Sequence, residues 1–188
     1  MAKVFVLLSR SQTYIARKIR KVTGDTFSHS SLAFDERLET LVSFARRFRC
    51  VPVPAGLVRE HLDAGYLGHH QNIFLRLFEF EVSEDALLKM KGRVDNMLRE
   101  YKRYKYDIKG LFASHKGIRK ERPYRYFCSG FVSEILEMSD DIRLPKVPFF
   151  MRPQDFADMP EGRCIFEGTV KELRSYVKRP CEQQGFDV

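Results

Sequence analysis

The sequence has no long hydrophobic run. Its longest apolar stretches span only a few residues, as in "VFVLLS" at Val4 to Ser9, whereas a helix that crosses a bilayer needs about 20. We therefore expect no transmembrane helix. The N-terminal "MAKVFVLLSRSQ" has no small-residue cleavage site behind its short apolar part, so it does not resemble a signal peptide. These absences predict a cytoplasmic protein that begins with a core strand.

Cysteine is sparse and never closely spaced. The four cysteines are Cys50, Cys128, Cys164 and Cys181. The sequence contains no CxxC pair and no HExxH motif, and His69 and His70 are adjacent instead of standing at ligand spacing. This pattern argues against a disulfide framework and against a built-in zinc site. We expect free thiols, no metal and no other cofactor.

Internal repeats and low-complexity segments are absent as well. The 188 residues are 44% hydrophobic and 31% charged, a balance that argues against disorder and favours a soluble globular protein. This length suits one compact domain that buries its own core. We therefore expect residues 1–188 to form a single domain.

Basic residues outnumber acidic ones, which gives a net charge of +8. The excess gathers in "RKIRK", "ARRFR" and "REYKRYKYDIKG", and such clusters can favour nucleic acid, an anionic lipid surface or an acidic substrate. No known RNA- or DNA-binding motif accompanies them. A solvated basic face is therefore expected, and nucleic acid is not expected as a partner.

The apolar pattern predicts alternating strands and helices. Strands are expected at 3–8, 27–34, 39–45, 72–82 and 163–170, and helices at 11–24, 83–104 and within 124–140. A loop with a short helix is expected at 144–156. The segments 47–71 and 106–125 are predicted to be irregular, the second with one short helical turn. This order is typical of an α+β fold, a mostly antiparallel sheet covered by helices.

Cys128 differs from the other cysteines because it falls in the first turn of a predicted helix. The unpaired N–H groups and the dipole at a helix N-terminus lower the pKa of a thiol, and the thiolate is the reactive form. The backbone N–H of Cys128 could also serve an oxyanion. A lone helical cysteine is more often a small buried hydrophobe, which is how we interpret the other three.

His29 is the candidate base, because imidazole has a suitable pKa. The other histidines, in polar or Gly-rich segments, are His61, His69, His70 and His115. Alternation along the predicted strand places His29, Ser31 and Ala33 on one face. These small neighbours would leave room for another element, such as the helix N-terminus that carries Cys128.

A third residue usually orients the base by accepting from its other ring nitrogen. On the following strand, Glu39 and Ser43 share a face and either could reach the imidazole across the strand pair. Ser43 is the preferred candidate because Glu39 lies closer to the turn. A hydroxyl would orient the ring without adding charge.

Three segments carry a resemblance to a known family. "FSHSSLAFDERLETLVSFAR", followed much later by "KYDIKGLF" and "YRYFCSGFVSEIL", resembles the NlpC-type papain-like cysteine hydrolases in their circularly permuted form, the YiiX-like branch. In ordinary members the Cys helix precedes the His strand, whereas permuted members have the reverse order. This chain has the permuted order over about residues 1 to 170.

The matches to the family are short and local. Its histidine motif, a small or hydroxyl residue, then His, then an apolar strand, falls on Ser28, His29 and 32–34. Its cysteine motif, an aromatic residue, Cys, Ser, any residue and two apolar residues, falls on 127–132. A Tyr-Asp pair falls on 106–107.

The resemblance implies a permuted papain-like fold and a site of Cys128, His29 and Ser43. Two positions depart from the family. Gly130 stands where the permuted branch often has Glu, although ordinary members have Cys-Ser-Gly. Ser43 stands where Glu or another strongly polar group is common, which puts turnover in question.

The first functional hypothesis is a thiol hydrolase that cleaves an amide bond in a peptide, a cell-wall peptide or a lipid-linked amide. The second is acyl transfer to or from lipids, with "REYKRYKYDIKGLF" in peripheral contact with an anionic membrane. That stretch is also typical of an exposed helix end with tyrosines packing inward. The third is a basic module for binding nucleic acid or protein, with a vestigial thiol pocket.

Overall fold

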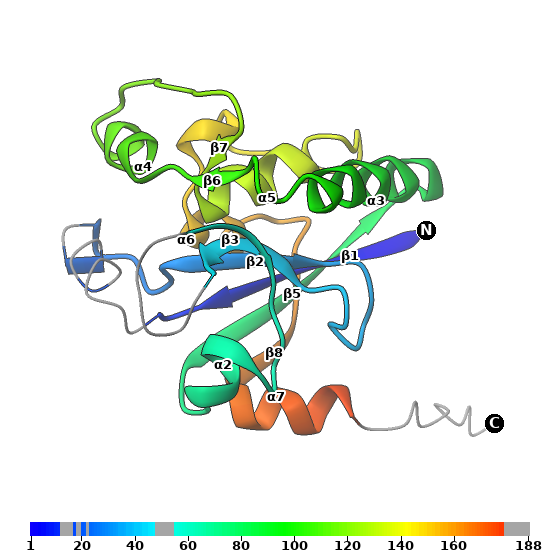
Figure 1. Ribbon diagram of the computed structural model, residues 1–188. Coiled ribbons are helices and arrows are strands. Elements are labelled where there is room, and N and C mark those ends of the chain that lie inside the picture. Colours follow the sequence, from blue (N-terminus) through cyan, green and yellow to red (C-terminus); the bar gives the residue numbers. More distant parts are fainter. Residues whose placement is uncertain (12–16, 18–19, 22, 48–54, 179–188) are drawn as a thin grey trace.

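The structure is a computed structural model and describes residues 1–11, 17, 20–21, 23–47 and 55–178 (Figure 1). It is an α+β fold, as predicted, built on one eight-stranded sheet in the order β7-β6-β4-β3-β2-β1-β5-β8. The strands are β1 (Ala2–Ser9), β2 (His29–Ala33), β3 (Val42–Arg46), β4 (Ala55–Arg59), β5 (Phe74–Val82), β6 (Lys105–Tyr106), β7 (Arg125–Tyr126) and β8 (Arg163–Thr169). Neighbouring strands are antiparallel except for β6 and β7.

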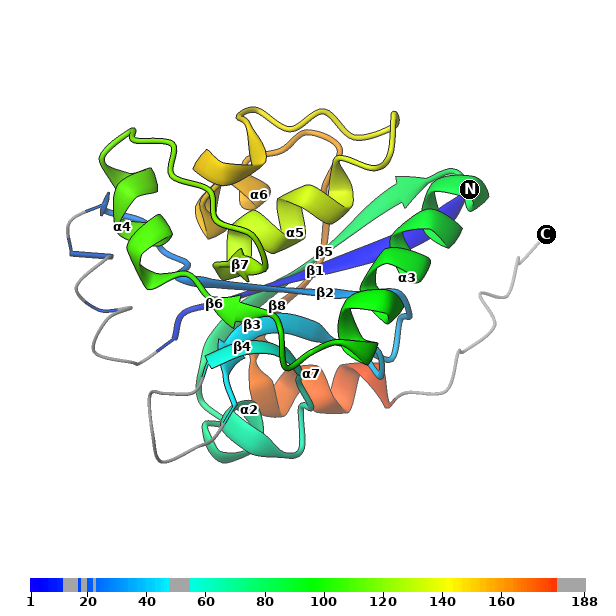
Figure 2. The same cartoon turned by 45° about the horizontal axis from the view of Figure 1, so that its top comes forward.

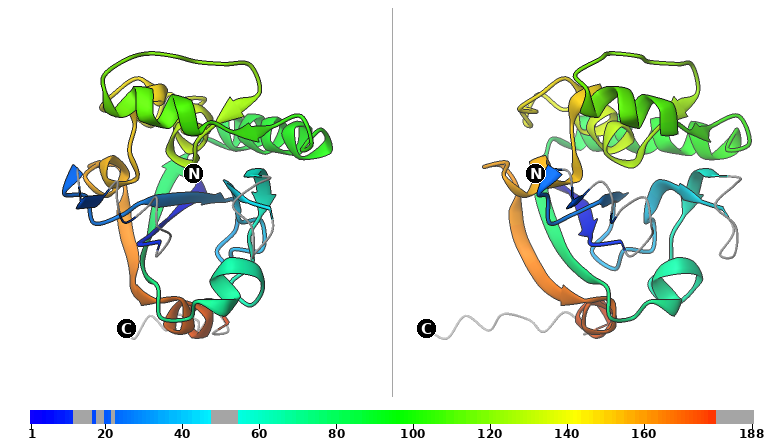
Figure 3. Two further views of the ribbon diagram at one scale, coloured as in Figure 1. Left: turned by 60° about the vertical axis from the view of Figure 1, so that its left-hand side comes forward. Right: turned by 90° about the vertical axis from the view of Figure 1, so that its left-hand side faces the viewer.

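Helices cover both faces of the sheet. They are α2 (Gly65–His69), α3 (Glu84–Arg99), α4 (Ile108–His115), α5 (Cys128–Leu136), α6 (Pro153–Ala157) and α7 (Val170–Val177), with a short 3₁₀ helix η1 (Pro148–Phe150). Figures 1 and 2 show α3, α4 and α5 on one side of the central strands, while α2 and α7 lie on the other. The two views of Figure 3 show the same layers edge-on.

Two hydrophobic clusters fill the space between these layers. On one face, Phe131 and Val132 of α5 pack in a cluster with Leu32 of β2 and Phe44 of β3. On the other face, Leu173 of α7 belongs to a second cluster that includes Leu7, Ala33 and Leu75. Strands that are buried on both faces carry continuous apolar runs, which explains the sequence of β1.

The long strands and helices agree with the sequence pattern. Strict alternation predicts β5, and Ser83 caps α3 by accepting a hydrogen bond from the Ala86 N–H at 3.2 Å. Helix α5 begins at Cys128, as expected. The helix predicted at 11–24 lies largely outside the described residues.

The prediction for 47–71 is wrong, because this segment contains β4 and α2. Strand β4 pairs along its whole length with β3 and touches β6 at Gly56. A Cβ at Gly56 would lie 2.2 Å from the Tyr104 carbonyl oxygen, so glycine is what allows these strands to meet. Helix α7 was also not predicted, although Thr169 and Glu172 form a capping box at its start.

The segment 106–125 is more ordered than expected. In place of one short turn it contains the eight-residue helix α4, flanked by β6 and β7. Tyr104 and Tyr106 pack inward against the core, as one interpretation of this stretch predicted, whereas Tyr101 is 43% exposed. No helix in the described part of the chain is both long enough and apolar enough to cross a bilayer.

Candidate active site

Cys128 is the first residue of α5 and is held there by local contacts. Phe127, in extended conformation, precedes it, and the Phe127 carbonyl accepts the first helical hydrogen bond from the Phe131 N–H at 3.0 Å. The Ser129 hydroxyl donates to the Met151 carbonyl at 2.6 Å, which ties this end of the helix to the segment before α6. The helix N-terminus and its unpaired N–H groups are thereby fixed around the thiol.

His29 is the first residue of β2, paired with Ser9 of β1. The Ser28 N–H donates to the Ser9 carbonyl at 3.1 Å, so the backbone on both sides of the histidine is anchored. The His29 side chain is 17% exposed. The side chain is therefore held at the start of β2 and remains partly accessible to solvent.

The carboxylate that contacts His29 belongs to Glu60, which the sequence reasoning missed. Glu60 directly follows β4, and its N–H donates to the Leu41 carbonyl at 2.8 Å. Its Oε1 lies 3.3 Å from His29 Nε2, and its Oε2 accepts a hydrogen bond from the Ser31 hydroxyl. The Ser31 hydroxyl is also 3.3 Å from His29 Nε2. The carboxylate is thus positioned from both sides.

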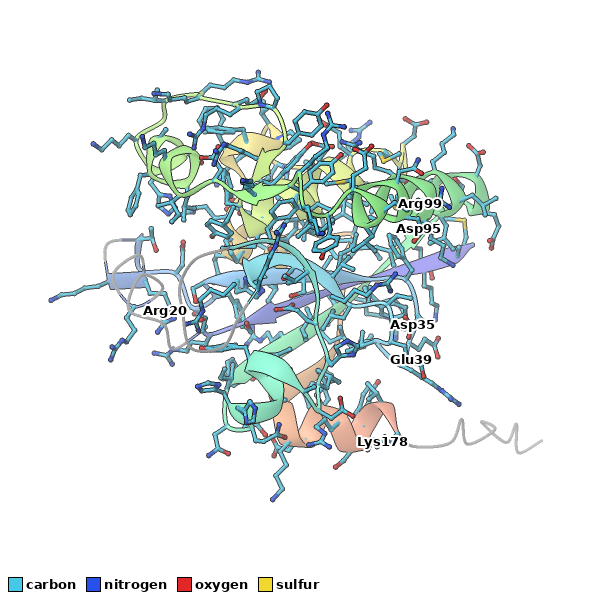
Figure 4. The ribbon with its side chains drawn as sticks, viewed as in Figure 1. Arg20, Asp35, Glu39, Asp95, Arg99 and Lys178 are labelled. Carbon is cyan, nitrogen blue, oxygen red and sulfur yellow. The ribbon has the colours of Figure 1, made fainter. Side chains whose placement is uncertain are left out.

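Neither predicted orienting residue contacts the His29 ring. Ser43 is fully buried on β3, and within the described ranges its hydroxyl has no hydrogen-bond partner, although it lies close enough to Glu60 to help lower the pKa of that carboxyl. Glu39 is exposed in the turn between β2 and β3, where its N–H donates to Asp35 Oδ1 at 2.8 Å. Figure 4 shows Asp35 and Glu39 at this turn, at the end of β2 away from His29.

The sequence predicts that the small residues beside His29 make room for the helix that carries Cys128. In the structure they make room for Glu60 instead. Helix α5 packs on the opposite face of the sheet, in the same cluster as Leu32, whereas Ala33, on the His29 face, belongs to the other cluster. Cys128 begins α5 and His29 begins β2, and their side chains are close enough for each to shift the pKa of the other.

The charges of the three side chains are coupled. Burial lowers the pKa of His29, but the Glu60 carboxylate and the neighbouring thiol outweigh it, so this pKa lies well above its usual value. Burial raises the pKa of Cys128, yet the His29 ring and the N–H groups of Ser30 and Ser129 bring it below its usual value. Burial also raises the pKa of Glu60, but His29 and Ser31 lower it overall. These contacts shift the site toward a thiolate beside an imidazolium and a carboxylate.

Tyr106 brings a phenol to the same thiol. Burial and the adjacent Cys128 raise the pKa of Tyr106 well above its usual value, so the hydroxyl keeps its proton and can donate. The next residue, Asp107, is buried, accepts the Gly110 N–H at 2.7 Å and forms an ion pair with Arg122. The two residues of the Tyr-Asp pair therefore have different roles. Tyr106 supplies a hydrogen-bond donor beside the thiol, and Asp107 caps the N-terminus of α4.

A cavity of about 1460 Å³ opens at the thiol and is lined by Cys128, His29, Glu60 and Tyr106. Its walls include many apolar side chains from β4, α3, α4 and the segments before β2, α5 and α6: Phe27, Leu57, Leu98, Ile108, Leu111, Phe127 and Met151. His61 and His115 also line it, and Nδ1 of His115 lies 2.8 Å from the Leu111 carbonyl oxygen of its own helix. The cavity exceeds the range of about 300–1,000 Å³ common for small-molecule sites.

Three further features can be described within the ranges that the structure covers. Cys128 and Cys164 are free thiols there, and Cys164 is exposed on β8. No group of three or more potential ligands among those residues is arranged to hold a metal ion. At Gly130, an added Cβ would lie 3.3 Å from the Phe127 ring, so a larger residue here requires that ring to shift.

Comparison of the chain with protein-family models, curated proteins and solved structures finds no match.

Proposed function

We propose that the protein is a thiol hydrolase that cleaves an amide bond. The observation that carries the proposal is the convergence of Cys128 at a helix N-terminus with a His29 ring held by the Glu60 carboxylate. A nucleophile, a base within reach of it and a third group that orients the base are the elements of a Cys-His hydrolytic site. Glu60 takes the orienting role that the sequence assigned to Ser43.

The reaction has two stages. The Cys128 thiolate attacks the amide carbonyl carbon, and the His29 imidazolium gives its proton to the leaving amine as the C–N bond breaks, which leaves a thioester. Neutral His29 then takes a proton from water while the water oxygen attacks the thioester carbonyl. Release of the acid restores the thiolate and the imidazolium. Glu60 stabilises the imidazolium at each stage.

Two donors can serve the oxyanion of the tetrahedral intermediates. The Cys128 N–H belongs to the first turn of α5, where backbone N–H groups have no helical acceptor. The Tyr106 hydroxyl lies against the thiol and stays protonated. A fixed pair of donors beside the nucleophile stabilises negative charge as it develops on the substrate oxygen.

We further propose that the fold is the circularly permuted papain-like type. Support comes from the order of the chain, in which the His strand β2 precedes the Cys helix α5, and from the packing of α5 across the antiparallel sheet beside β2 and β3. The Glu60 carboxylate also supplies the strongly polar orienting group that this branch commonly has.

The apolar cavity favours a second candidate, acyl transfer. Apolar walls beside Cys128 suit a substrate with a large apolar acyl group. The first stage is the same as in hydrolysis, and the thioester is then attacked by an alcohol or amine in place of water. A panel of acyl amides offered with and without glycerol or ethanolamine separates the two candidates by their products.

The test of the proposal is acyl-enzyme capture. The protein is incubated with panels of peptide and fatty-acyl amides, quenched in acid and analysed by mass spectrometry. We expect an acyl adduct on the peptide that contains Cys128, together with amine release, and neither in Cys128→Ala. Amine release that persists in Cys128→Ala contradicts the proposal. Steep salt-dependent binding of nucleic acid without any thiol reactivity favours the interaction module instead.

A further inference from the structure

Helix α4 turns large apolar side chains toward solvent. Ile108 is 40% exposed and Phe112 is 50% exposed, and they lie one turn apart on the same face of the helix. The opposite face is packed: Leu111 is buried, and the Ser114 hydroxyl donates to the Phe149 carbonyl at 2.8 Å. Just after the helix, Ile118 is 55% exposed. The apolar side chains protrude from a firmly seated element.

Exposed basic side chains lie beside these apolar groups in the chain. Lys109, Lys116 and Lys120 are exposed, and no acidic group in the described ranges lies within ion-pair distance of them. Nearby arginines are neutralised within the protein, Arg119 by Glu121 and Arg122 by Asp107. The lysines therefore leave a net positive charge around the protruding apolar residues.

This surface lies at the outside of the molecule and at the cavity. Figures 1 and 2 show α4 at a corner of the protein, with the segment that follows it running over the outer side of the helical layer. Ile108 and Leu111 of the same helix line the cavity that contains Cys128. A surface that binds α4 would therefore be close to the entrance of the candidate active site.

We propose that α4 and the segment 116–120 dock the protein on an anionic lipid bilayer. Protruding aliphatic and aromatic residues with lysines beside them are the pattern by which a helix lies in a membrane interface, with apolar groups below the headgroups and lysines beside the lipid phosphates. A partner helix would need an apolar groove, whereas α4 offers a convex ridge. The acidic bilayer complements both its charge and its shape.

The docking does not depend on the proposed hydrolase chemistry, but it gives the cavity a source of substrates. A bilayer held against α4 would present amphipathic molecules next to the apolar walls that lead to Cys128. The basic stretch that the sequence pointed to begins earlier, at Arg99, and its Tyr104 and Tyr106 face inward. The docking surface therefore shares only the last part of that stretch, Ile108 to Phe112, and continues beyond it to residue 120.

The test is co-sedimentation of the full chain with vesicles. We expect binding to phosphatidylcholine vesicles that contain phosphatidylserine, little binding to phosphatidylcholine alone, and weakening with salt. Phe112→Ser and the double variant Lys109→Glu/Lys116→Glu should each lose most of the binding, about five-fold or more for each lysine reversed. Since these side chains are exposed, both variants should keep the thermal unfolding midpoint of the wild type.

Matched controls lie elsewhere on the surface. Leu88→Ser removes an apolar side chain that is 69% exposed on α3, and Lys171→Glu/Lys178→Glu reverses two charges on or next to α7, where Figure 4 labels Lys178. We expect both controls to bind like the wild type. Equal loss in the control and test variants overturns the proposal. A second result also overturns the proposal: the protein binds polyglutamate but no vesicles, and Phe112→Ser leaves the polyglutamate binding unchanged. That result favours an acidic protein partner.

Discussion

His29 Nε2 lies 3.3 Å from Glu60 Oε1, although the two residues are 31 positions apart and belong to different strand ends. The contact spans β3, which lies between β2 and β4 in the sheet. With Nε2 engaged by the carboxylate, we expect Nδ1 to be the ring nitrogen that exchanges protons with the Cys128 thiol.

Replacing Glu60 should impair the base without removing it. In Glu60→Gln the imidazolium loses its carboxylate, so we expect turnover of an acyl-amide substrate to fall by about 10²-fold. Ser43→Ala is the comparison variant, because the Ser43 hydroxyl only helps to lower the pKa of Glu60 and has no hydrogen-bond partner in the described residues, so it should reduce turnover far less. Steady-state kinetics of both variants check this. A larger loss in Ser43→Ala than in Glu60→Gln would restore Ser43 as the orienting residue.

The same contact should make stability depend on pH. The pKa of Glu60 is lowered by folding, so its contribution is present above its ordinary 4.5 and is lost as pH falls through the lowered value. The pKa of His29 is raised, so its contribution is complete below 6.5 and is lost as pH rises through the raised value.

The destabilisation caused by Glu60→Gln should therefore be greatest between pH 4.5 and 6.5, at about 1–3 kcal/mol. Urea unfolding of the variant and the wild type across the pH range measures this difference. A difference that does not vary with pH would show that the two side chains are not charged partners.

Tyr106→Phe removes one hydroxyl and little volume. If the phenol stabilises the oxyanion, kcat should fall by about 10²-fold with KM nearly unchanged. The alkylation rate of Cys128 should stay close to the wild-type rate, because alkylation forms no oxyanion. If the variant loses alkylation and turnover together, Tyr106 acts on the reactivity of the Cys128 thiol and not by stabilising the oxyanion of the intermediate.

Asp107 should matter for stability and not directly for chemistry. Its carboxylate caps α4 through the Gly110 N–H and pairs with Arg122 while buried. We expect Asp107→Ala to lower the free energy of unfolding by about 2–4 kcal/mol, since it leaves a helix end uncapped and an arginine unpaired. Asp85→Ala, which breaks an exposed pair with Lys89 on α3, is the control and should have no measurable effect.

Periodic patterns predicted much of the fold. The alternation in "FLRLFEFEV" and the capped apolar stripe of α3 each specify an element through local chemistry. Strand β4 could not be recognised this way, because "AGLVR" is short, contains glycine and follows a Pro-rich stretch. Its identity depends on pairing with β3, which is a tertiary contact.

The site was predicted in the same partial way. Cys128 and His29 could be proposed because each begins an element and its neighbours have distinctive types. Glu60 could not, because it follows the strand that went unrecognised, and an isolated glutamate before "HLD" has the pattern of a solvated loop. Once β4 is placed beside β3, alternation puts Val58 and Glu60 on the face of Ser43 and toward His29.

The alkylation rate of Cys128 as a function of pH tests the central claim most directly. Wild type and His29→Ala are treated with iodoacetamide below neutral pH, and the peptides that contain Cys128 and the exposed Cys164 are quantified by mass spectrometry. If His29 holds Cys128 as a thiolate, Cys128 should react about ten-fold or more faster in the wild type than in His29→Ala, while Cys164 reacts equally in both. Equal and slow modification of Cys128 in the two proteins would contradict the account.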